Sequence, residues 1–267
     1  MKARILPECC YQFNEMSYED IKTAYSKQTT ITGYVEEILT DKEEVMVKLG
    51  ENMYGYIPFS EVTIYPLSYS HSSTRLYPVQ IAILYHKNVR VKVSNITKER
   101  ICLSRKQNME EAYEHLKDCS TVYFHITSQT ASMAFGDIGA GINGFLRIID
   151  VCKARIRNIS EYFHKHDMVW MSVLEVDDTK QFSLSYKNTF PPYSPKDFRT
   201  GDVYQGRIGE PVDRLHSGYY IDISPNVNGI MDANSMTPIL RYGDKVECYI
   251  SKSDAKGLKL KFLKKLN

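Results

Sequence analysis

One short motif occurs three times and constrains the fold of this chain more than any other feature. In each copy a strand-like run ends in an aliphatic residue, a short polar stretch follows, and a glycine then precedes hydrophobic residues. The same interval separates Leu49 from Gly55, Ile138 from Gly144 and Ile223 from Gly229. A shared interval, with Asn-Gly in two copies and Tyr-Gly in one, predicts a single β-hairpin copied three times, with the glycine closing the turn.

Further repeated phrases frame these hairpins. Leu103-Ser104-x-Lys106 recurs as Leu184-Ser185-x-Lys187, a domain-sized distance further along the chain. Around the first hairpin, five short runs of alternating polar and apolar residues occur without a long helix between them. Short strands at this density are typical of a small closed barrel such as the OB-fold. We therefore predict an all-β chain of three tandem five-stranded OB-fold barrels, joined by short connecting helices.

The predicted domain boundaries follow from these phrases. Residues 1–27 form an N-terminal arm and a short helix, and residues 188–198 form a linker that is stiff because it contains three prolines. Residues 108–119 form a helical connector. The three repeats are assigned to residues 28–107, 120–187 and 199–267.

Two capping signals place the helices. Ser17 followed by Asp20 is a variant of the capping box, and the apolar residues after it share one helical face, so we expect a helix that ends near Lys27. Asn108 precedes a second run with helical spacing, which predicts that Asn108 caps the connector helix.

Composition excludes several classes of protein. The net charge of +2 does not by itself indicate a nucleic-acid binder, and no apolar run is long enough to span a membrane. None of the six cysteines forms a C-x-x-C pair, and no histidine pair stands near them at metal-ligand spacing. No nucleophile–base motif or phosphate-binding loop is present. We therefore expect a cytoplasmic monomer, neither enzyme nor membrane protein, that needs no metal or other cofactor.

The third copy carries a resemblance to a known family. Its frame is Gly201-Asp202 with Gly206-x-Ile208, then Gly218-Tyr219-Tyr220-Ile221-Asp222-Ile223, then Asn228-Gly229-Ile230-Met231, then Gly243-Asp244. This order resembles the S1-type RNA-binding repeat, a five-stranded OB-fold found in ribosomal protein S1 and several ribonucleases. The resemblance covers about residues 28–263 as three tandem copies, in an arrangement similar to the S1-like proteins of low-GC Gram-positive bacteria.

The resemblance implies which residues contact RNA. In the third copy Tyr220 matches a stacking aromatic residue of the family, and in the middle copy Phe135 matches an aromatic position and Asp177 an acidic one. Arg147 replaces the family's histidine in the middle copy, while Gln181 replaces its arginine. In the first copy only Arg100 matches.

The residues themselves support some of these positions. Tyr219 and Tyr220 are adjacent on a strand and point to opposite faces, so one of them is in the core, and the family register makes Tyr220 the exposed one. An exposed ring can stack on a base, and Tyr56 is a further candidate for this role. The alternative for each ring is a core or surface position without function.

The C-terminal stretch is basic. Lys259 and Lys261 alternate with leucines and share the outward face of a strand, where they either bind phosphates or keep the surface soluble. Arg105, Lys106, Arg155 and Arg157 are candidates to extend a phosphate-binding strip. These residues and the resemblance together predict a single-stranded RNA-binding protein related to translation, with the small ribosomal subunit as a partner. The alternative is a protein-interaction scaffold whose first repeat docks on the ribosome or another RNA-processing assembly; an accessory subunit of a nuclease is a third hypothesis.

Overall fold

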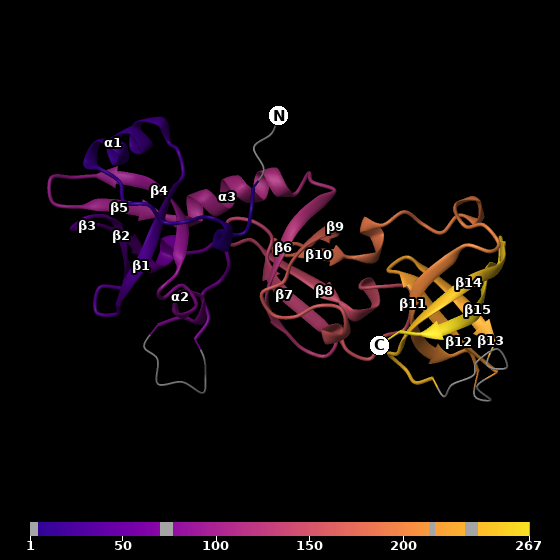
Figure 1. Ribbon diagram of the computed structural model, residues 1–267. Helices are drawn as coiled ribbons and strands as arrows, with labels where there is room; N and C mark the ends of the chain where they lie inside the picture. The colour runs from indigo at the N-terminus through magenta and orange to yellow at the C-terminus, as the bar shows by residue number, and fades with distance from the viewer. Residues whose placement is uncertain (1–4, 70–76, 214–216, 233–239, 267) are drawn as a thin grey trace. The chain divides into compact units, whose positions relative to one another are not determined.

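The computed structural model describes residues 5–69, 77–213, 217–232 and 240–266. Their strands form three closed five-stranded barrels, as predicted (Figure 1). The strands close in the orders β1-β2-β3-β5-β4, β10-β8-β7-β6-β9 and β11-β12-β13-β15-β14. Read around each ring, these orders are the same, and the third strand of each barrel pairs in parallel with the fifth. One topology is therefore repeated three times.

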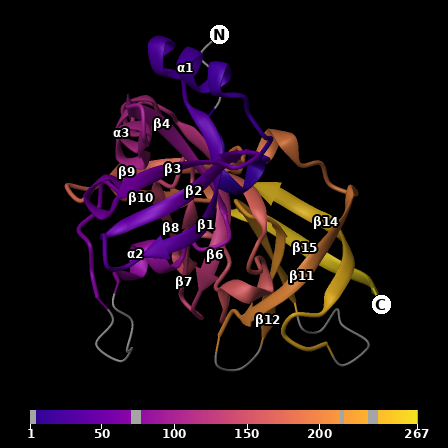
Figure 2. The ribbon, with the colours of Figure 1, turned by 90° about the vertical axis from the view of Figure 1, so that its left-hand side faces the viewer.

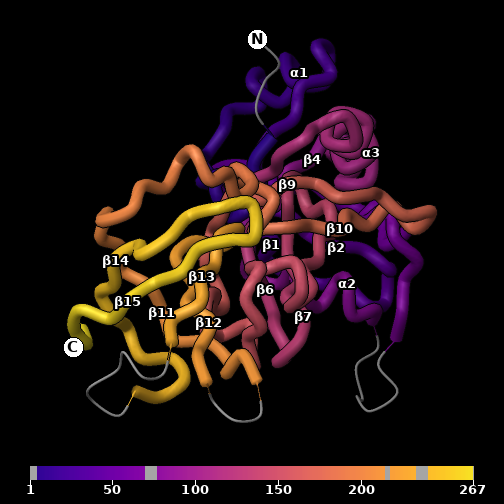
Figure 3. The backbone as a smooth tube through the Cα atoms, turned by 90° about the vertical axis from the view of Figure 1, so that its right-hand side faces the viewer, coloured from indigo at the N-terminus to yellow at the C-terminus, as the bar shows by residue number. Residues whose placement is uncertain are grey.

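The strand bounds follow the alternation of burial along the chain. The first barrel is built from β1 (Ile31–Leu39), β2 (Glu44–Gly50), β3 (Met53–Pro58), β4 (Asn88–Ile96) and β5 (Ile101–Ser104). The second is built from β6 (Thr121–Gln129), β7 (Met133–Asp137), β8 (Asn143–Arg147), β9 (Met168–Val176) and β10 (Phe182–Ser185). The third is built from β11 (Val203–Pro211), β12 (Gly218–Ser224), β13 (Val227–Asp232), β14 (Lys245–Asp254) and β15 (Gly257–Lys265). Figure 3, which draws the backbone as a tube, labels all five of these strands.

The helical segments are short and lie between the strands or before them. The α-helices are α1 (Tyr18–Lys27), α2 (Val79–Ala82) and α3 (Arg105–Leu116). The 3₁₀ turns are η1 (Glu8–Cys10), η2 (Phe59–Glu61), η3 (Ile148–Asp150), η4 (Ile159–Glu161), η5 (Lys187–Thr189) and η6 (Pro195–Asp197).

The repeated glycine lies inside a strand and not in the turn. Gly55 is in β3 and Gly229 is in β13, so the prediction that the glycine closes the turn was wrong. A Cβ atom at Gly55 would lie 2.5 Å from Leu103 Cδ1, and one at Gly229 would lie 2.6 Å from Leu260 Cδ1. Glycine recurs there because the third strand passes so close to a core leucine of the fifth strand that a side chain does not fit.

Helix α1 begins as the sequence predicts, whereas α3 begins earlier. The Ser17 hydroxyl accepts the Asp20 N–H at 3.2 Å, the Asp20 carboxylate accepts the Ser17 N–H at 2.9 Å, and the helix ends at Lys27. In α3 the cap is Ser104, whose hydroxyl accepts the Gln107 N–H at 3.0 Å. Asn108 is not the cap, because the helix begins before it and the serine of the closing phrase accepts a free N–H of the first turn.

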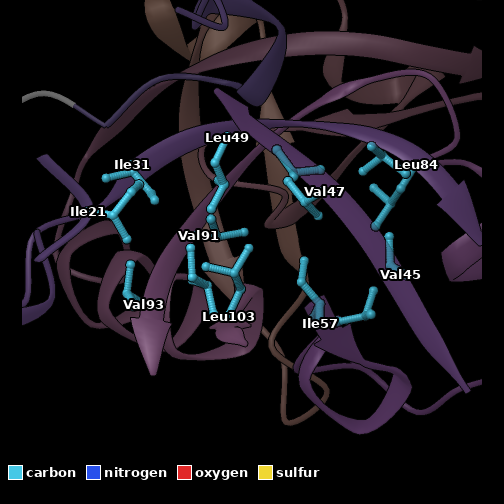
Figure 4. Packing of buried hydrophobic residues seen from close by; sticks show 14 of the residues in the cluster. Ile21, Ile31, Val45, Val47, Leu49, Ile57, Leu84, Val91, Val93 and Leu103 are labelled. Carbon is cyan, nitrogen blue, oxygen red and sulfur yellow. The ribbon is translucent and has the colours of Figure 1, made fainter. Parts of the chain in front are cut away.

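The first barrel has a continuous apolar core. Val45, Val47 and Leu49 of β2 point inward at alternate positions and are fully buried (Figure 4). Ile21 of α1 belongs to the same cluster, so this helix packs against the barrel (Figures 2 and 4). The repeated alternation of the sequence thus forms the core directly.

Two compact units divide the chain. The first comprises Met1–His125, Asp137–Asn143 and Val176–Gln181, and the second comprises Ile126–Gly136, Gly144–Glu175 and Phe182–Asn267. The turns that join β7 to β8 and β9 to β10 therefore belong to the first unit, whereas most of the second barrel and all of the third form the second unit.

A buried ion pair holds the N-terminal arm inside the first unit. Arg105 is 6% exposed, and its guanidinium donates to the two Glu8 carboxylate oxygens at 2.9 and 2.8 Å and to the Val62 carbonyl at 2.9 Å. The Asp137 carboxylate accepts the backbone N–H of Glu8 at 2.6 Å and that of Gly141 at 2.9 Å. The arm is thus hydrogen-bonded both to α3 and to the turn that follows β7.

Candidate nucleic-acid interface

A row of three outward side chains crosses the third barrel. Tyr220 of β12 is paired with Ile230 of β13, and Ile230 is paired with Lys259 of β15. Residues directly opposite on neighbouring strands project from the same face of the sheet. Ile230 is 38% exposed and Lys259 is exposed, so this face is the outer one, and Tyr220 is half-buried within it.

The neighbouring tyrosine has the opposite orientation. Tyr219 is paired with Met231, which is paired with the buried Leu260, and Tyr219 packs against the core of the third barrel. Lys259 and Lys261 are both exposed on β15, because Leu258 and Leu260 occupy the alternate, inward positions. Tyr220 and the two lysines therefore lie on the outer surface of the same barrel.

Tyr220 lines a hollow of about 640 Å³, called here the Tyr220 hollow. Three of its other lining side chains are cationic, Lys153, Arg155 and Lys256, and one is a carboxylate, Glu210. Arg157 donates to the Glu210 carboxylate at 2.8 Å, so that negative charge is already compensated. The hollow thus combines a tyrosine ring, the apolar Ile230 and an excess of positive charge. Flat rings and cations together are what single-stranded nucleic acids bind.

The second barrel offers a more modest outer surface. Phe135 of β7 is 38% exposed. Arg147 ends β8 and forms an ion pair with Asp150 at 2.9 Å, which reduces its net charge toward a ligand. Asp177 accepts the Thr179 hydroxyl at 2.6 Å and the Gln181 N–H at 2.9 Å, and these hydrogen bonds, that of the hydroxyl foremost, lower the pKa of Asp177. Asp177 and Gln181 therefore shape the turn after β9.

In the first barrel the candidate residues bind one another. The Arg100 guanidinium lies over the Tyr56 ring at 4.4 Å from its centroid, and Arg100 also forms an ion pair with Glu44. The hydrogen bond from Arg100 to Glu44 is the main cause that raises the pKa of Arg100. One face of the ring is thus covered by the cation, and the cation is neutralised by the carboxylate. A base can stack on that face of Tyr56 only after Arg100 has moved.

Two absences bear on the chemistry. Across the ranges of the chain given above, no three His, Cys, Asp or Glu side chains come together as a potential metal site. Among the helices in those ranges, none is both long and apolar enough to cross a lipid bilayer.

Comparison with known proteins finds relatives among ribosomal proteins. No protein-family model matches the sequence. The chain is 25% identical over 228 residues to small ribosomal subunit protein bS1 of Staphylococcus saprophyticus, a match that covers 84% of this chain and 56% of that protein. It is 30% identical over 196 residues to a bS1 homologue of Bacillus cereus, a match that covers 72% of this chain and 50% of that protein. These matches agree with the three barrels of one topology.

The three barrels fit S1-type OB-fold repeats, and most of the chain is similar to these bS1 proteins. The chain spans about half the length of the bS1 relatives that it matches. A further relative is 4-hydroxy-3-methylbut-2-enyl diphosphate reductase of Clostridium acetobutylicum, which is 23% identical over 232 residues. That match covers 84% of this chain and only 34% of the reductase.

The S1-type repeats bring together some of the residues singled out in the sequence and separate others. Arg155 lines the Tyr220 hollow, although it comes from the second repeat. Arg105 cannot extend a phosphate-binding strip, because it is buried and paired with Glu8; that part of the prediction was wrong. Arg157 is exposed, but it is engaged with Glu210 and stacks over the Tyr242 ring at 4.1 Å.

Sequence reasoning missed several residues of the hollow. Lys153 lies in a bend after η3, and Tyr193 lies in the proline-rich linker, so neither belongs to a repeated phrase. Lys256, in contrast, is part of the basic C-terminal stretch that the sequence singles out. One signal was available: from Lys153 to Arg157 charged and apolar residues alternate, which places Lys153 and Arg155 on one side of the segment.

Proposed function

We propose that this S1-type chain binds single-stranded RNA, with the third repeat as its strongest contact. The observation that supports this most is Tyr220, which lies on the outer face of the third barrel and lines a hollow with Lys153, Arg155 and Lys256. A tyrosine ring stacks on any base, and the cations attract the phosphates, so binding depends weakly on sequence.

The relatives supply the setting of the proposal. Two of them are named as bS1 or its homologue, a protein of the small ribosomal subunit. We infer that the RNA is messenger RNA, that the partner is the small ribosomal subunit in the cytoplasm, and that the chain acts as a monomer. The proposal assigns no catalytic activity to the chain, because its match to the reductase covers a third of that enzyme.

Replacing Tyr220 with alanine tests the proposal. Tyr220→Ala is expected to weaken binding of a labelled oligouridylate by about 1–3 kcal/mol, the range measured for the loss of one stacked base. The dependence of affinity on salt should stay the same, because the tyrosine makes no phosphate contact. Fluorescence anisotropy at several salt concentrations measures both quantities.

Tyr25→Ala is the matched control, since Tyr25 is an exposed tyrosine of α1, in the first unit. Equal affinities of Tyr220→Ala and Tyr25→Ala would exclude Tyr220 as a stacking residue. Binding is referred to the folded fraction, so that a loss of stability in either variant is not counted as a loss of affinity.

The two lysines of β15 are expected to act on the salt dependence instead. If each lysine binds one phosphate, Lys259→Gln and Lys261→Gln should each flatten the slope of log affinity against log salt by about 0.7. The same anisotropy titrations measure this slope, and stability should change by less than about 0.5 kcal/mol because both side chains are exposed. Unchanged slopes would mean that the lysines only keep the surface soluble.

The first repeat favours a second role, that of a protein contact. Its candidate aromatic Tyr56 is covered by Arg100, whereas Ile83 and Tyr85, which follow α2, are 57% and 46% exposed. Exposed apolar side chains of this size occur at protein interfaces. The scaffold hypothesis therefore applies to the first repeat, alongside RNA binding by the third.

A further inference from the structure

A short segment of the second repeat lines two hollows. The first of them is the Tyr220 hollow. A second hollow of about 740 Å³, called here the Ile149 hollow, shares Lys153 and Arg155 as lining residues and is further lined by Ile148, Ile149, Cys152, Ala154, Ile156, Lys187 and Asn226. Since the two hollows have Lys153 and Arg155 in common, they adjoin along this segment.

The segment is fixed at both ends. The Lys153 N–H donates to the Pro225 carbonyl at 2.7 Å, and the Arg157 N–H donates to the Glu161 carboxylate at 2.8 Å. Between these anchors Ala154 and Ile156 are buried, whereas Lys153 and Arg155 are exposed. The backbone thus holds two cationic side chains outward at alternate positions, where the two hollows meet.

A polar network joins the second repeat to the third within the second unit. Glu161 forms an ion pair with Arg207 and accepts the Tyr242 hydroxyl at 2.8 Å. Tyr162 donates its hydroxyl hydrogen to Asp222. Burial and the hydrogen bond to Glu161 raise the pKa of Tyr242 to about 12, so this hydroxyl remains a donor at neutral pH. The walls of the two hollows, which come from both repeats, are held together by this network.

The charges at the junction favour a polyanion. Among the lining residues that the structure describes for the two hollows, Glu210 is the only carboxylate, and it is paired with Arg157. Lys187 donates to the Ile149 carbonyl at 2.6 Å and lies 3.6 Å from an Asp150 carboxylate oxygen, so its positive charge is partly compensated. Lys153 and Arg155 are therefore the two cations that line both hollows, whereas Lys256 lines the Tyr220 hollow alone.

Each hollow also offers a surface for a base. Tyr220 and Ile230 line the first, and Ile149, which is 62% exposed, lines the second. Surfaces for bases on either side of a pair of cations fit a single strand, whose phosphates alternate with bases along its length.

We propose that Lys153 and Arg155 bind the phosphates of one RNA strand where it passes from the Tyr220 hollow to the Ile149 hollow. The second and third repeats then bind a continuous strand and not two separate ones. This inference rests on the proposed function, and it adds a phosphate-binding segment that lies outside the barrel faces.

The double variant Lys153→Gln/Arg155→Gln tests the inference with a fluorescein-labelled oligouridylate of about 12 nucleotides, within the site sizes of OB-folds. Removal of two phosphate-binding side chains is expected to flatten the salt slope by about 1.4. If the wild type and the variant bind equally at about 1 M salt, this change in slope makes the variant bind about 25-fold more weakly at about 0.1 M. The charge-preserving variant Lys153→Arg/Arg155→Lys should retain the slope of the wild type.

The control variant Lys27→Gln/Lys98→Gln removes the same charge from exposed positions of the first unit. If the wild type binds and Lys153→Gln/Arg155→Gln has the slope of this control, the inference is overturned while the proposed function stands. If the wild type shows no salt-dependent binding of the oligouridylate, the proposed function itself fails. A flattened slope in Lys153→Gln/Arg155→Gln alone supports the inference.

Discussion

Arg105→Met is expected to lower the free energy of unfolding of the first unit by about 3–5 kcal/mol, the cost of removing one partner from a buried ion pair. The side chains of Arg105 and Glu8 are 7% and 12% exposed, so neither is well hydrated. Without the guanidinium, Glu8 faces Asp137 uncompensated. Burial, and after it the charge of Glu8, already raises the pKa of Asp137, whereas Arg105 opposes that rise. The arm should therefore detach in the variant.

Lys22→Met is the matched control, because Lys22 and Glu19 also lie 2.8 Å apart but are 48% and 79% exposed. An exposed pair contributes about 0–1 kcal/mol. The only tryptophan, Trp170, lies in the second unit, so amide hydrogen exchange of β1 to β5 measures the first unit directly. Equal exchange in the two variants would show that the buried pair does not stabilise the unit.

The fold was predictable because each barrel repeats one local pattern. Alternation placed Val45, Val47 and Leu49 inward, and the recurring interval to Gly55 located the third strand of each barrel. The glycine was assigned to a turn for a plausible local reason, Asn-Gly. Its actual cause is the close approach of a core leucine of the fifth strand, Leu260 at Gly229 and Leu103 at Gly55, which is a contact between strands distant in sequence. Local pattern predicts strands well and cannot reveal such contacts.

The candidate site was only partly predictable for the same reason. Tyr220 belongs to the repeated frame and Lys259 to the alternating C-terminal stretch of the same repeat, and the register of three strands aligns them. Lys153 comes from another repeat, so no pattern within the third repeat indicates it. Arg105 illustrates the opposite error: beside Lys106 it resembles a surface cation, and only the distant Glu8 shows that it is buried.

Asp222 combines a position in the repeated frame with an unusual environment. It is 8% exposed on β12, and Tyr162 donates to one of its carboxylate oxygens, while the other has no hydrogen-bond partner among the described residues. Burial is the main cause that raises the pKa of Asp222 from 3.8 to about 7. A carboxylate that must ionise without a second hydrogen-bond partner is costly inside a protein.

The pKa of Asp222 predicts how the stability of the second unit depends on pH. Between about pH 4 and 7 the unfolded chain has lost this proton and the folded chain keeps it, so the contribution of Asp222 falls as pH rises and is constant above 7. Each pH unit in this window lowers the free energy of unfolding by at most about 1.36 kcal/mol, so the second unit loses about 4 kcal/mol or less between about pH 4 and 7. Asp222→Asn is neutral at every pH and keeps an oxygen for Tyr162, so it should match the wild type near pH 4 and exceed its stability at pH 8.

Urea unfolding followed by Trp170 fluorescence measures this difference, because Trp170 and Asp222 lie in the same unit. Subtracting the wild type from Asp222→Asn at each pH removes the contributions of the other titrating groups, which the two chains share. Amide exchange of β12 checks that the transition includes the third barrel. A difference that stays constant from pH 4 to 8 would show that Asp222 ionises in the folded chain as it does in the unfolded one.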